Sequence, residues 1–320
     1  MRIFGSASYH FIERRRIAYV ISALAILAGI GGMVVNLSSI GSWQNYGVDF
    51  EGGSLIQVTF SEETTTADLR ASLGGASAPD VTEFAGENVF LIRAAQDAET
   101  TVDQVREEIE VALGQAFGPE SFEIDRTELV GPKIGAELQR KAAVAILISF
   151  GLTLLYIAIR FELRFGMAAI IATMHDILIT LGFLALFRVE ISLPTVAAIL
   201  TIVGYSLNDT IVVFDRIREN LGKKGARKRD QVDVVNQSIN ETLPRTVLTS
   251  LTTLVVLLAL LIVGPAVIRD FSIVLILGVL IGTYSSIFVA SPALIEIQKR
   301  IGEAKPKTEP VTHAQDAIPT

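Results

Sequence analysis

The chain has 320 residues, half of them hydrophobic, and its mean hydropathy of +0.50 lies well above that of a soluble domain. The net charge of −7 does not fit a nucleic-acid-binding protein, and the absence of cysteine excludes disulfides, thiol nucleophiles and cysteine-ligated metals. The hydrophobic residues occur in long blocks, which indicates an integral membrane protein with one polar domain.

Residues 1–16 are polar and basic, and residues 17–35 form the first apolar segment. A cleaved signal peptide is the competing interpretation of this pattern. The apolar segment is longer than a usual signal-peptide core, and no small-x-small cleavage site follows it. The pattern therefore predicts an uncleaved first transmembrane helix, with residues 1–16 as a cytoplasmic N-terminus.

Residues 36–141 form the polar domain. Alternating apolar residues predict strands, and apolar residues at helical spacing predict helices. The predicted elements are a strand at 54–60, a helix at 66–73, strands at 81–84 and 89–93 joined by a turn at 85–88, a helix at 102–116 and a strand at 122–130. This β-α-β-β-α-β order predicts an α+β domain of the ferredoxin-like type between the first and second transmembrane helices.

Five further apolar segments follow the polar domain, so the sequence predicts an α-helical membrane protein with six transmembrane helices. The five segments are residues 142–159, 165–187, 193–214, 245–263 and 271–293.

Basic residues predict the orientation of these helices. Arg14 to Arg16, Arg160 with Arg164, Arg216 to Arg229, and Lys299 with Arg300 all fall on one side of the membrane, which should be the cytoplasm. The polar domain is then periplasmic. Residues 215–244 should form a basic cytoplasmic loop and residues 294–320 a cytoplasmic tail, disordered from 305 onward. The basic run at 223–229 anchors this topology; a nucleic-acid patch is disfavoured because no aromatic residues are interleaved with it.

The fourth segment carries a carboxylate, Asp209, inside its apolar run. A charged side chain there costs about 2.5–3.5 kcal/mol on insertion scales, so it should face protein or water, and it is by default a functional candidate. The simpler alternative is a buried Asp that fixes helix packing through hydrogen bonds. We predict that Asp209 binds an ion or a proton and that Gly204 lets another helix approach. The neighbouring hydrogen-bonding residues are Tyr205, Ser206 and Asn208.

His175 and Asp176 lie near the middle of the third segment. Helix rise places Asp176 roughly 16 Å and Asp209 roughly 9 Å from the cytoplasmic ends of their helices. Because the two helices are consecutive and antiparallel, both carboxylates can line one polar core. A histidine in an apolar helix is often only a packing residue, but beside an aspartate it is a candidate for a proton relay.

Arg245 begins the fifth segment. Three threonines share its helical face, and two more hydroxyl residues lie next to that face. Arg245 either anchors the helix at the lipid headgroups or turns inward and pairs with Asp209, and we favour the pair. The hydroxyl residues are Thr246, Thr249, Ser250, Thr252 and Thr253.

Small residues recur every fourth position in the sixth segment, at Gly278, Gly282, Ser286 and Ala290. Such a ridge suits close helix packing, and we assign it no chemistry. The sequence contains no phosphate-binding glycine loop, Ser-His-Asp arrangement or HExxH motif. We therefore expect no enzyme activity and no cofactor, and we expect any energy to come from an ion gradient.

Several stretches of the sequence resemble the SecF family, the smaller half of the bacterial SecD–SecF protein-export complexes, which are related to the RND transporters. The stretches are residues 47–58, 128–138, 165–182, 203–220, 242–254 and 276–292. The resemblance implies six transmembrane helices, a periplasmic ferredoxin-like domain, SecD as partner and association with the SecYEG channel. It also links Asp209 of GYSLNDT and Arg245 of LPRT to proton conduction.

The sequence and the resemblance together predict an accessory subunit that, with SecD, uses the proton-motive force to promote export of polypeptides across the cytoplasmic membrane. Its partners would be SecD, SecYEG, the translocating polypeptide and membrane lipids, without nucleic acid. An RND-type exporter of small molecules or lipids and a passive scaffold are the alternatives. The coupling ion is expected to be H⁺, and a carboxylate serves Na⁺ as well.

Overall fold

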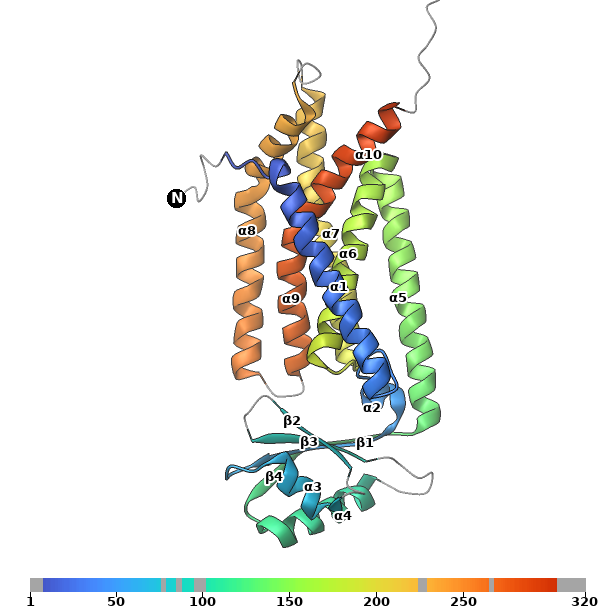
Figure 1. The fold of residues 1–320 in the computed structure, drawn as a ribbon, viewed down its shortest axis with the longest axis vertical. Helices are drawn as coiled ribbons and strands as arrows, with labels where there is room; N and C mark the ends of the chain where they lie inside the picture. Colours follow the sequence, from blue (N-terminus) through green and yellow to red (C-terminus); the bar gives the residue numbers. More distant parts are fainter. Residues whose placement is uncertain are drawn as a thin grey trace, which may run out of the picture.

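A computed structural model describes residues 8–75, 79–84, 88–94, 102–223, 229–264 and 268–303. Long helices form a bundle, and a small β-sheet domain lies at one end of it (Figure 1). The N-terminal segment and α10 lie at the opposite end, which we call the termini end. Three sequence predictions fall largely outside the described residues: the turn at 85–88, the basic run at 223–229 and the tail at 305–320.

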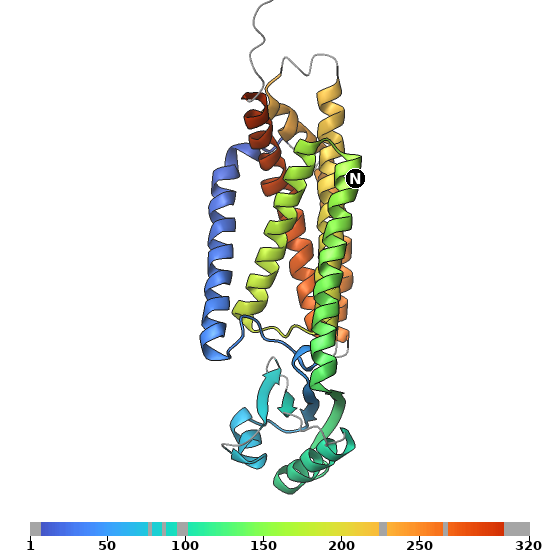
Figure 2. The ribbon, with the colours of Figure 1, turned by 90° about the vertical axis from the view of Figure 1, so that its right-hand side faces the viewer.

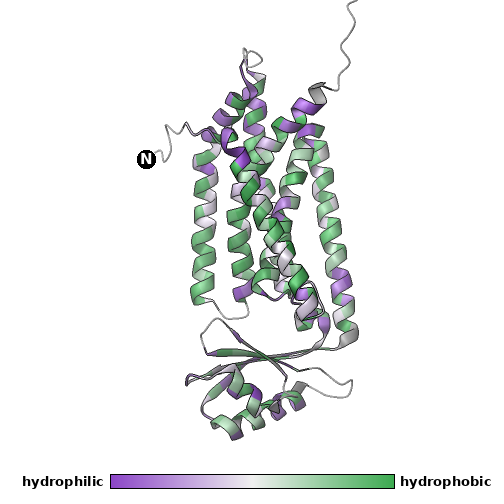
Figure 3. Ribbon diagram, in the orientation of Figure 1, coloured by the Kyte–Doolittle hydropathy of each residue, from purple (hydrophilic) through white to green (hydrophobic). Residues whose placement is uncertain are grey.

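Six helical segments are long and apolar enough to cross a membrane, which confirms the number of predicted spans. Figure 3 shows that their apolar residues form a band between a polar termini end and the polar domain. The helices are α1 (Arg15–Ser39), α5 (Pro132–Arg160), α6 (Leu163–Phe187), α7 (Leu193–Gly222), α8 (Gln231–Val263) and α9 (Arg269–Ser285), the last continued by a π-helical turn at Ser286–Ala290 and by α10 (Ser291–Glu303).

Several helices extend beyond the boundaries that the sequence predicts. α5 begins at Pro132 rather than at 142, and proline suits the first position of a helix because its missing N–H is not needed there. α7 continues to Gly222 and α8 begins at Gln231, where the Asp230 side chain accepts a hydrogen bond from Val232 N. The bounds predicted for the loop at 215–244 are therefore too wide, since residues 215–222 and 231–244 are helical; hydropathy marks only the part of each helix that is apolar.

The polar domain contains a four-stranded sheet in the spatial order β2-β3-β1-β4, with antiparallel neighbours. Because β1 and β2 are both antiparallel to β3, they run parallel to each other on either side of it. The elements are β1 (Gly53–Phe60), α3 (Thr66–Ser72), β2 (Asp80–Phe84), β3 (Val89–Ala94), α4 (Val102–Phe117) and β4 (Phe122–Val130), in the order that the sequence predicts.

Both domain helices cover one face of the sheet. Ile56 and Ile92 from the strands pack with Leu69 of α3 and Leu113 of α4 in a buried cluster. Figure 1 shows these helices on the side of the sheet that faces away from the bundle. The alternation of the strands thus builds a small core of its own.

A second set of contacts joins the domain to the bundle. The segment that contains α2 (Val48–Glu51) runs beside the loop between α6 and α7, where Gly47 N donates to Ile191 O at 2.9 Å. The Asp49 carboxylate caps α7 by accepting from Leu193 N at 2.8 Å. Arg93 of β3 forms an ion pair with Glu190 of the same loop. The domain is therefore attached to the α6–α7 loop as well as to α1 and α5.

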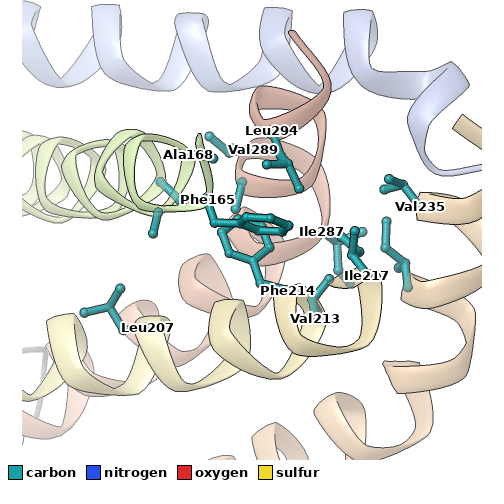
Figure 4. Packing of buried hydrophobic residues seen from close by; sticks show 14 of the residues in the cluster. Phe165, Ala168, Leu207, Val213, Phe214, Ile217, Val235, Ile287, Val289 and Leu294 are labelled. Atoms are coloured by element: carbon teal, nitrogen blue, oxygen red, sulfur yellow. The ribbon is translucent and has the colours of Figure 1, made fainter. Parts of the chain in front are cut away.

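Apolar side chains fill the core at the termini end of the bundle. Phe165 of α6 and Phe214 of α7 meet with ring centroids 5.3 Å apart, nearly perpendicular to each other. Figure 4 shows Val213 and Ile217 of α7 around them, with Ile287 from the π-helical turn and Leu294 of α10 nearby. We call this group the apolar plug.

Candidate ion-coupling site

Asp176 of α6 is the more enclosed of the two candidate carboxylates, with 1% of the residue exposed. Its Oδ2 accepts hydrogen bonds from Ser206 Oγ of α7 and from Ser285 Oγ of α9, the latter at 2.8 Å. Its Oδ1 lies 2.8 Å from Nδ1 of the adjacent His175. Three helices therefore supply partners to one carboxylate, and both of its oxygens are engaged.

His175 connects this carboxylate to the first transmembrane helix. Its Nε2 lies 2.9 Å from Ser22 Oγ of α1. Ser22 Oγ in turn lies 3.2 Å from the Tyr284 hydroxyl, which donates to Ala18 O at 2.9 Å. The Tyr284 ring stacks on the imidazole with centroids 6.1 Å apart. His175 and Asp176 thus lie in one hydrogen-bonded chain that reaches from α7 to α1.

Asp209 of α7 is also buried, at 2% exposure, but it is poorly bonded. Thr283 Oγ1 of α9 lies 3.5 Å from its Oδ2, a long contact. A threonine hydroxyl has a single proton to donate, and this one has a better acceptor in Val279 O at 2.8 Å, with Ser250 Oγ of α8 at 2.6 Å as its other neighbour. Among the described residues, Asp209 therefore accepts at most a weak hydrogen bond.

The two carboxylates lie on different sides of α9. Thr283 contacts Asp209 and Ser285 contacts Asp176, and residues two apart in an α-helix point about 200° apart. Ser206 and Asp209 are three residues apart on α7. The sequence allows both carboxylates to line one polar core, and in the structure they contact different sides of α9, Asp209 through Thr283 and Asp176 through Ser285.

Small residues of α9 make that contact close. A Cβ built at Gly282 would lie 2.9 Å from Ser206 Cβ, and one at Gly278 would lie 2.1 Å from the Ile202 side chain. Ser286 is buried and donates to Thr283 O at 3.0 Å. Gly204 differs, because no atom of the described residues lies within 4 Å of a Cβ built there. Among the described residues, no other helix therefore packs closely against Gly204, although the sequence predicts such a contact.

Arg245 does not form the direct pair with Asp209 that the sequence analysis favours. Its side chain is exposed, and in the described residues no ion pair joins the two. The buried face of α8 carries the adjacent Thr246 and Ser250. Neighbouring residues in a helix point about 100° apart, so Arg245 faces outward when Thr246 faces inward.

Other polar residues of α7 and α8 are exposed with Arg245. Asn208 is exposed on α7, and Thr249 and Thr252 are exposed on α8, where both hydroxyls donate to carbonyls of their own helix at 3.0 Å. Tyr205 OH reaches Thr253 Oγ1 at 3.4 Å and so links the two helices. We call Asn208, Arg245, Thr249 and Thr252 the open polar face.

The sequence does not single out four residues of these networks: Ser22, Thr283, Tyr284 and Ser285. Each is a hydroxyl residue inside an apolar segment, which is the only signal the sequence offers. Single hydroxyls are common in membrane helices because they can donate to their own backbone. In the described residues, no group of three His, Cys, Asp or Glu side chains lies close enough to hold a metal ion.

Six apolar helices with two buried carboxylates define a polytopic membrane protein, and comparisons with known proteins identify its family. Residues 110–300 match the model "Protein export membrane protein SecD/SecF, C-terminal", and residues 45–63 match the "SecD/SecF GG Motif". A protein translocase subunit SecF from Gemmatimonas aurantiaca is 43% identical over 94% of this chain and 90% of its own length. The subunit from Rhodothermus marinus is 42% identical over 94% of this chain and 96% of its own.

Solved structures agree with these sequence matches. A crystal structure of SecDF from Thermus thermophilus, described as a translocon-associated membrane protein, has a TM-score of 0.80 and 38% identity. SecDF in a super-membrane-facing form has a TM-score of 0.66 and 37% identity. Each match spans 40% of the SecDF chain. It includes 94% of this chain in the first structure and 93% in the second. The chain belongs to the SecF family of protein translocase subunits, within the larger SecD/SecF group.

Proposed function

We propose that this chain is an accessory subunit of the Sec protein translocase that works with SecD and uses an ion gradient to promote polypeptide export. Asp209 is the observation that carries the proposal, because it is a buried carboxylate with only one contact, of 3.5 Å, among the described residues. A carboxylate without fixed donors can take up and release a cation at modest cost. Its relatives are named protein translocase subunits, which supplies the process that the ion drives.

The open polar face supports SecD as the partner that completes the site. An arginine exposed to lipid at membrane depth is costly, whereas a protein neighbour can provide a counter-charge. Asn208 and Arg245 lie on that exposed face, and Asn208 is next to the buried Asp209 in the sequence. A SecD helix packed there would finish the surroundings of Asp209. The SecYEG channel and the exported polypeptide are the further partners of the complex.

We assign the termini end to the cytoplasm and the polar domain, as a ferredoxin-like unit, to the periplasmic side. The positive-inside rule supports this assignment, because Arg160 is the last residue of α5 and Arg216 lies near the end of α7, and both helices end at the termini end (Figure 1). H⁺ is the proposed coupling ion, with Na⁺ as the alternative outcome. No cofactor takes part in this function.

The domain is the proposed element that passes the ion-binding event to the polypeptide. Its contacts with the α6–α7 loop, which include the Arg93–Glu190 pair, connect it to the two helices that carry Asp176 and Asp209. A rigid-body shift can transmit a local charge change in this way. A disulfide engineered between the domain and the loop near Arg188 should block export until it is reduced, and undiminished export with the disulfide formed would contradict the moving domain.

Export driven by separately imposed gradients tests the proposal. Inverted membrane vesicles that contain this chain, SecD and SecYEG would receive either a pH gradient or a sodium gradient after the ATP-driven step is stopped. We expect the pH gradient to complete translocation of a model preprotein, with Asp209→Asn abolishing the effect. Stimulation of export by the sodium gradient alone would mean that the coupling ion is Na⁺. Export that responds to neither gradient would leave this chain only a scaffold role in the complex.

A further inference from the structure

The bundle offers a polar route past the apolar plug. Between α6 and α7, Phe165 and Phe214 close the core at the termini end with side chains that carry no polar atoms (Figure 4). On the α1 side, the chain of hydrogen bonds from Asp176 continues through His175, Ser22 and Tyr284 to Ala18 O. The α1 side is therefore where polar contacts continue from Asp176.

The direction of this chain follows from the course of α1. Ser22 and Ala18 are four residues apart, which is about 6 Å of helix rise toward the termini end. One turn further, Arg15 forms a partly exposed ion pair with Glu296 of α10 at 3.5 Å. α1 lies at the edge of the bundle and packs mainly on α6 (Figure 2). The chain thus leads from the buried carboxylate toward solvent-exposed charges.

The three side chains between Asp176 and Ala18 O, those of His175, Ser22 and Tyr284, can each both donate and accept a hydrogen bond. The Tyr284 hydroxyl has two acceptors within reach, Ala18 O at 2.9 Å and Ser22 Oγ at 3.2 Å, so its single proton can point either way. A π-helical turn starts directly after Ser285, and such turns occur frequently at functional sites. A network that served only packing would not need hydroxyl groups whose donor and acceptor roles can be exchanged.

We propose that Ser22, Tyr284 and His175 form a proton relay through which Asp176 exchanges protons with the termini end of the bundle. This inference rests on the proposed ion-coupled function and adds two residues, Ser22 and Tyr284, to it. His175 is the transfer residue, because its two ring nitrogens face the two halves of the chain.

A proton leaves Asp176 by the following balanced steps. The carboxyl O–H bond breaks as His175 Nδ1 gains the proton, and His175 Nε2 releases its own proton to Ser22 Oγ. Ser22 passes its hydroxyl proton to the Tyr284 oxygen, and Tyr284 releases its hydroxyl proton to water at the termini end. Asp176 ends as a carboxylate, each hydroxyl keeps one proton, and the imidazole has exchanged tautomers. Proton uptake reverses every step.

Infrared spectroscopy after a pH jump tests the relay in the purified full chain. The carboxyl band of Asp176 is identified by its disappearance in Asp176→Asn. We expect Ser22→Ala and Tyr284→Phe to slow its proton exchange by about tenfold or more, which corresponds to roughly 1.4 kcal/mol or more of barrier. Tyr284→Phe keeps the ring that stacks on His175 and so preserves the packing. Thr173→Val is the matched control, because this buried hydroxyl donates only to its own helix at Ala169 O.

Unchanged exchange rates in Ser22→Ala and Tyr284→Phe would overturn the relay, as would an Asp176 carboxyl band that shows no proton exchange after the pH jump. Gradient-driven export separates this result from the proposed function. If Asp209→Asn abolishes export and both relay variants keep it, the relay is wrong and the function stands. If export ignores Asp209→Asn, the proposed function fails, and the infrared rates still decide the relay.

Discussion

The two buried carboxylates differ in how completely this chain surrounds them. Among the described residues, Asp176 has hydrogen-bond partners from α6, α7 and α9 on both oxygens, whereas Asp209 has one contact of 3.5 Å. Burial of a charge without compensating hydrogen bonds is costly, so the arrangement around Asp209 is unfinished in a single chain. The comparison teaches that this chain completes the surroundings of Asp176 by itself, while Asp209 is positioned to respond to an ion and a partner.

The largest expected effect separates the two residues by function. Asp209→Asn should abolish gradient-driven export while leaving insertion and thermal stability nearly unchanged, because the amide keeps the size of the carboxyl and few contacts are lost. ATP-driven export by the channel in the same vesicles is the internal control. Wild-type export by the Asn variant would remove Asp209 from the mechanism.

The next effect separates them by stability. Asp176→Leu should lower the free energy of unfolding by about 2 kcal/mol, since three hydrogen bonds worth roughly 0.6 kcal/mol each are lost. Asp209→Leu should cost clearly less, because it removes only the long Thr283 contact. Unfolding of the isolated chain in detergent, followed by circular dichroism, measures both. Equal losses of unfolding free energy would mean that hydrogen bonds stabilise the chain equally at the two carboxylates.

The close packing of α7 against α9 can be tested by substituting two glycines. Gly282→Ala should destabilise the chain by about 1 kcal/mol, because its new Cβ would lie 2.9 Å from Ser206 Cβ and force α7 and α9 apart. Gly204→Ala is the matched control on α7, where the described residues leave open space, and it should be neutral or slightly stabilising. A reversed order of the two stabilities would contradict the packing described for α7 and α9.

The sequence predicts the six spans and both carboxylates because each depends on local composition. An apolar run fixes a span, and a charge inside it is conspicuous. The helix ends could not be placed, since α5, α7 and α8 continue through polar residues that hydropathy assigns to loops. The direction of Arg245 was also beyond the sequence, because helical spacing groups it with Thr249 without saying which face meets α9.

The smallest expected effect concerns Asp209 and Arg245. A double-mutant cycle of Asp209→Asn and Arg245→Met in the isolated chain should give a coupling within about 0.5 kcal/mol, as expected of residues that make no direct contact. The same cycle for Asp176→Asn and Ser285→Ala should exceed that value because these residues share a hydrogen bond. A large coupling between Asp209 and Arg245 in the isolated chain would restore the direct pair.

Crosslinking from the open polar face tests the central claim most directly, because the native chain has no cysteine to interfere. A photoactivatable thiol reagent attached to Asn208→Cys in native membranes should capture SecD with high yield. The same reagent on Leu147→Cys, at an exposed apolar position of α5, serves as the lipid-facing control. Capture of lipid alone at Asn208→Cys, as at the control position, would contradict the claim that a partner completes the Asp209 site.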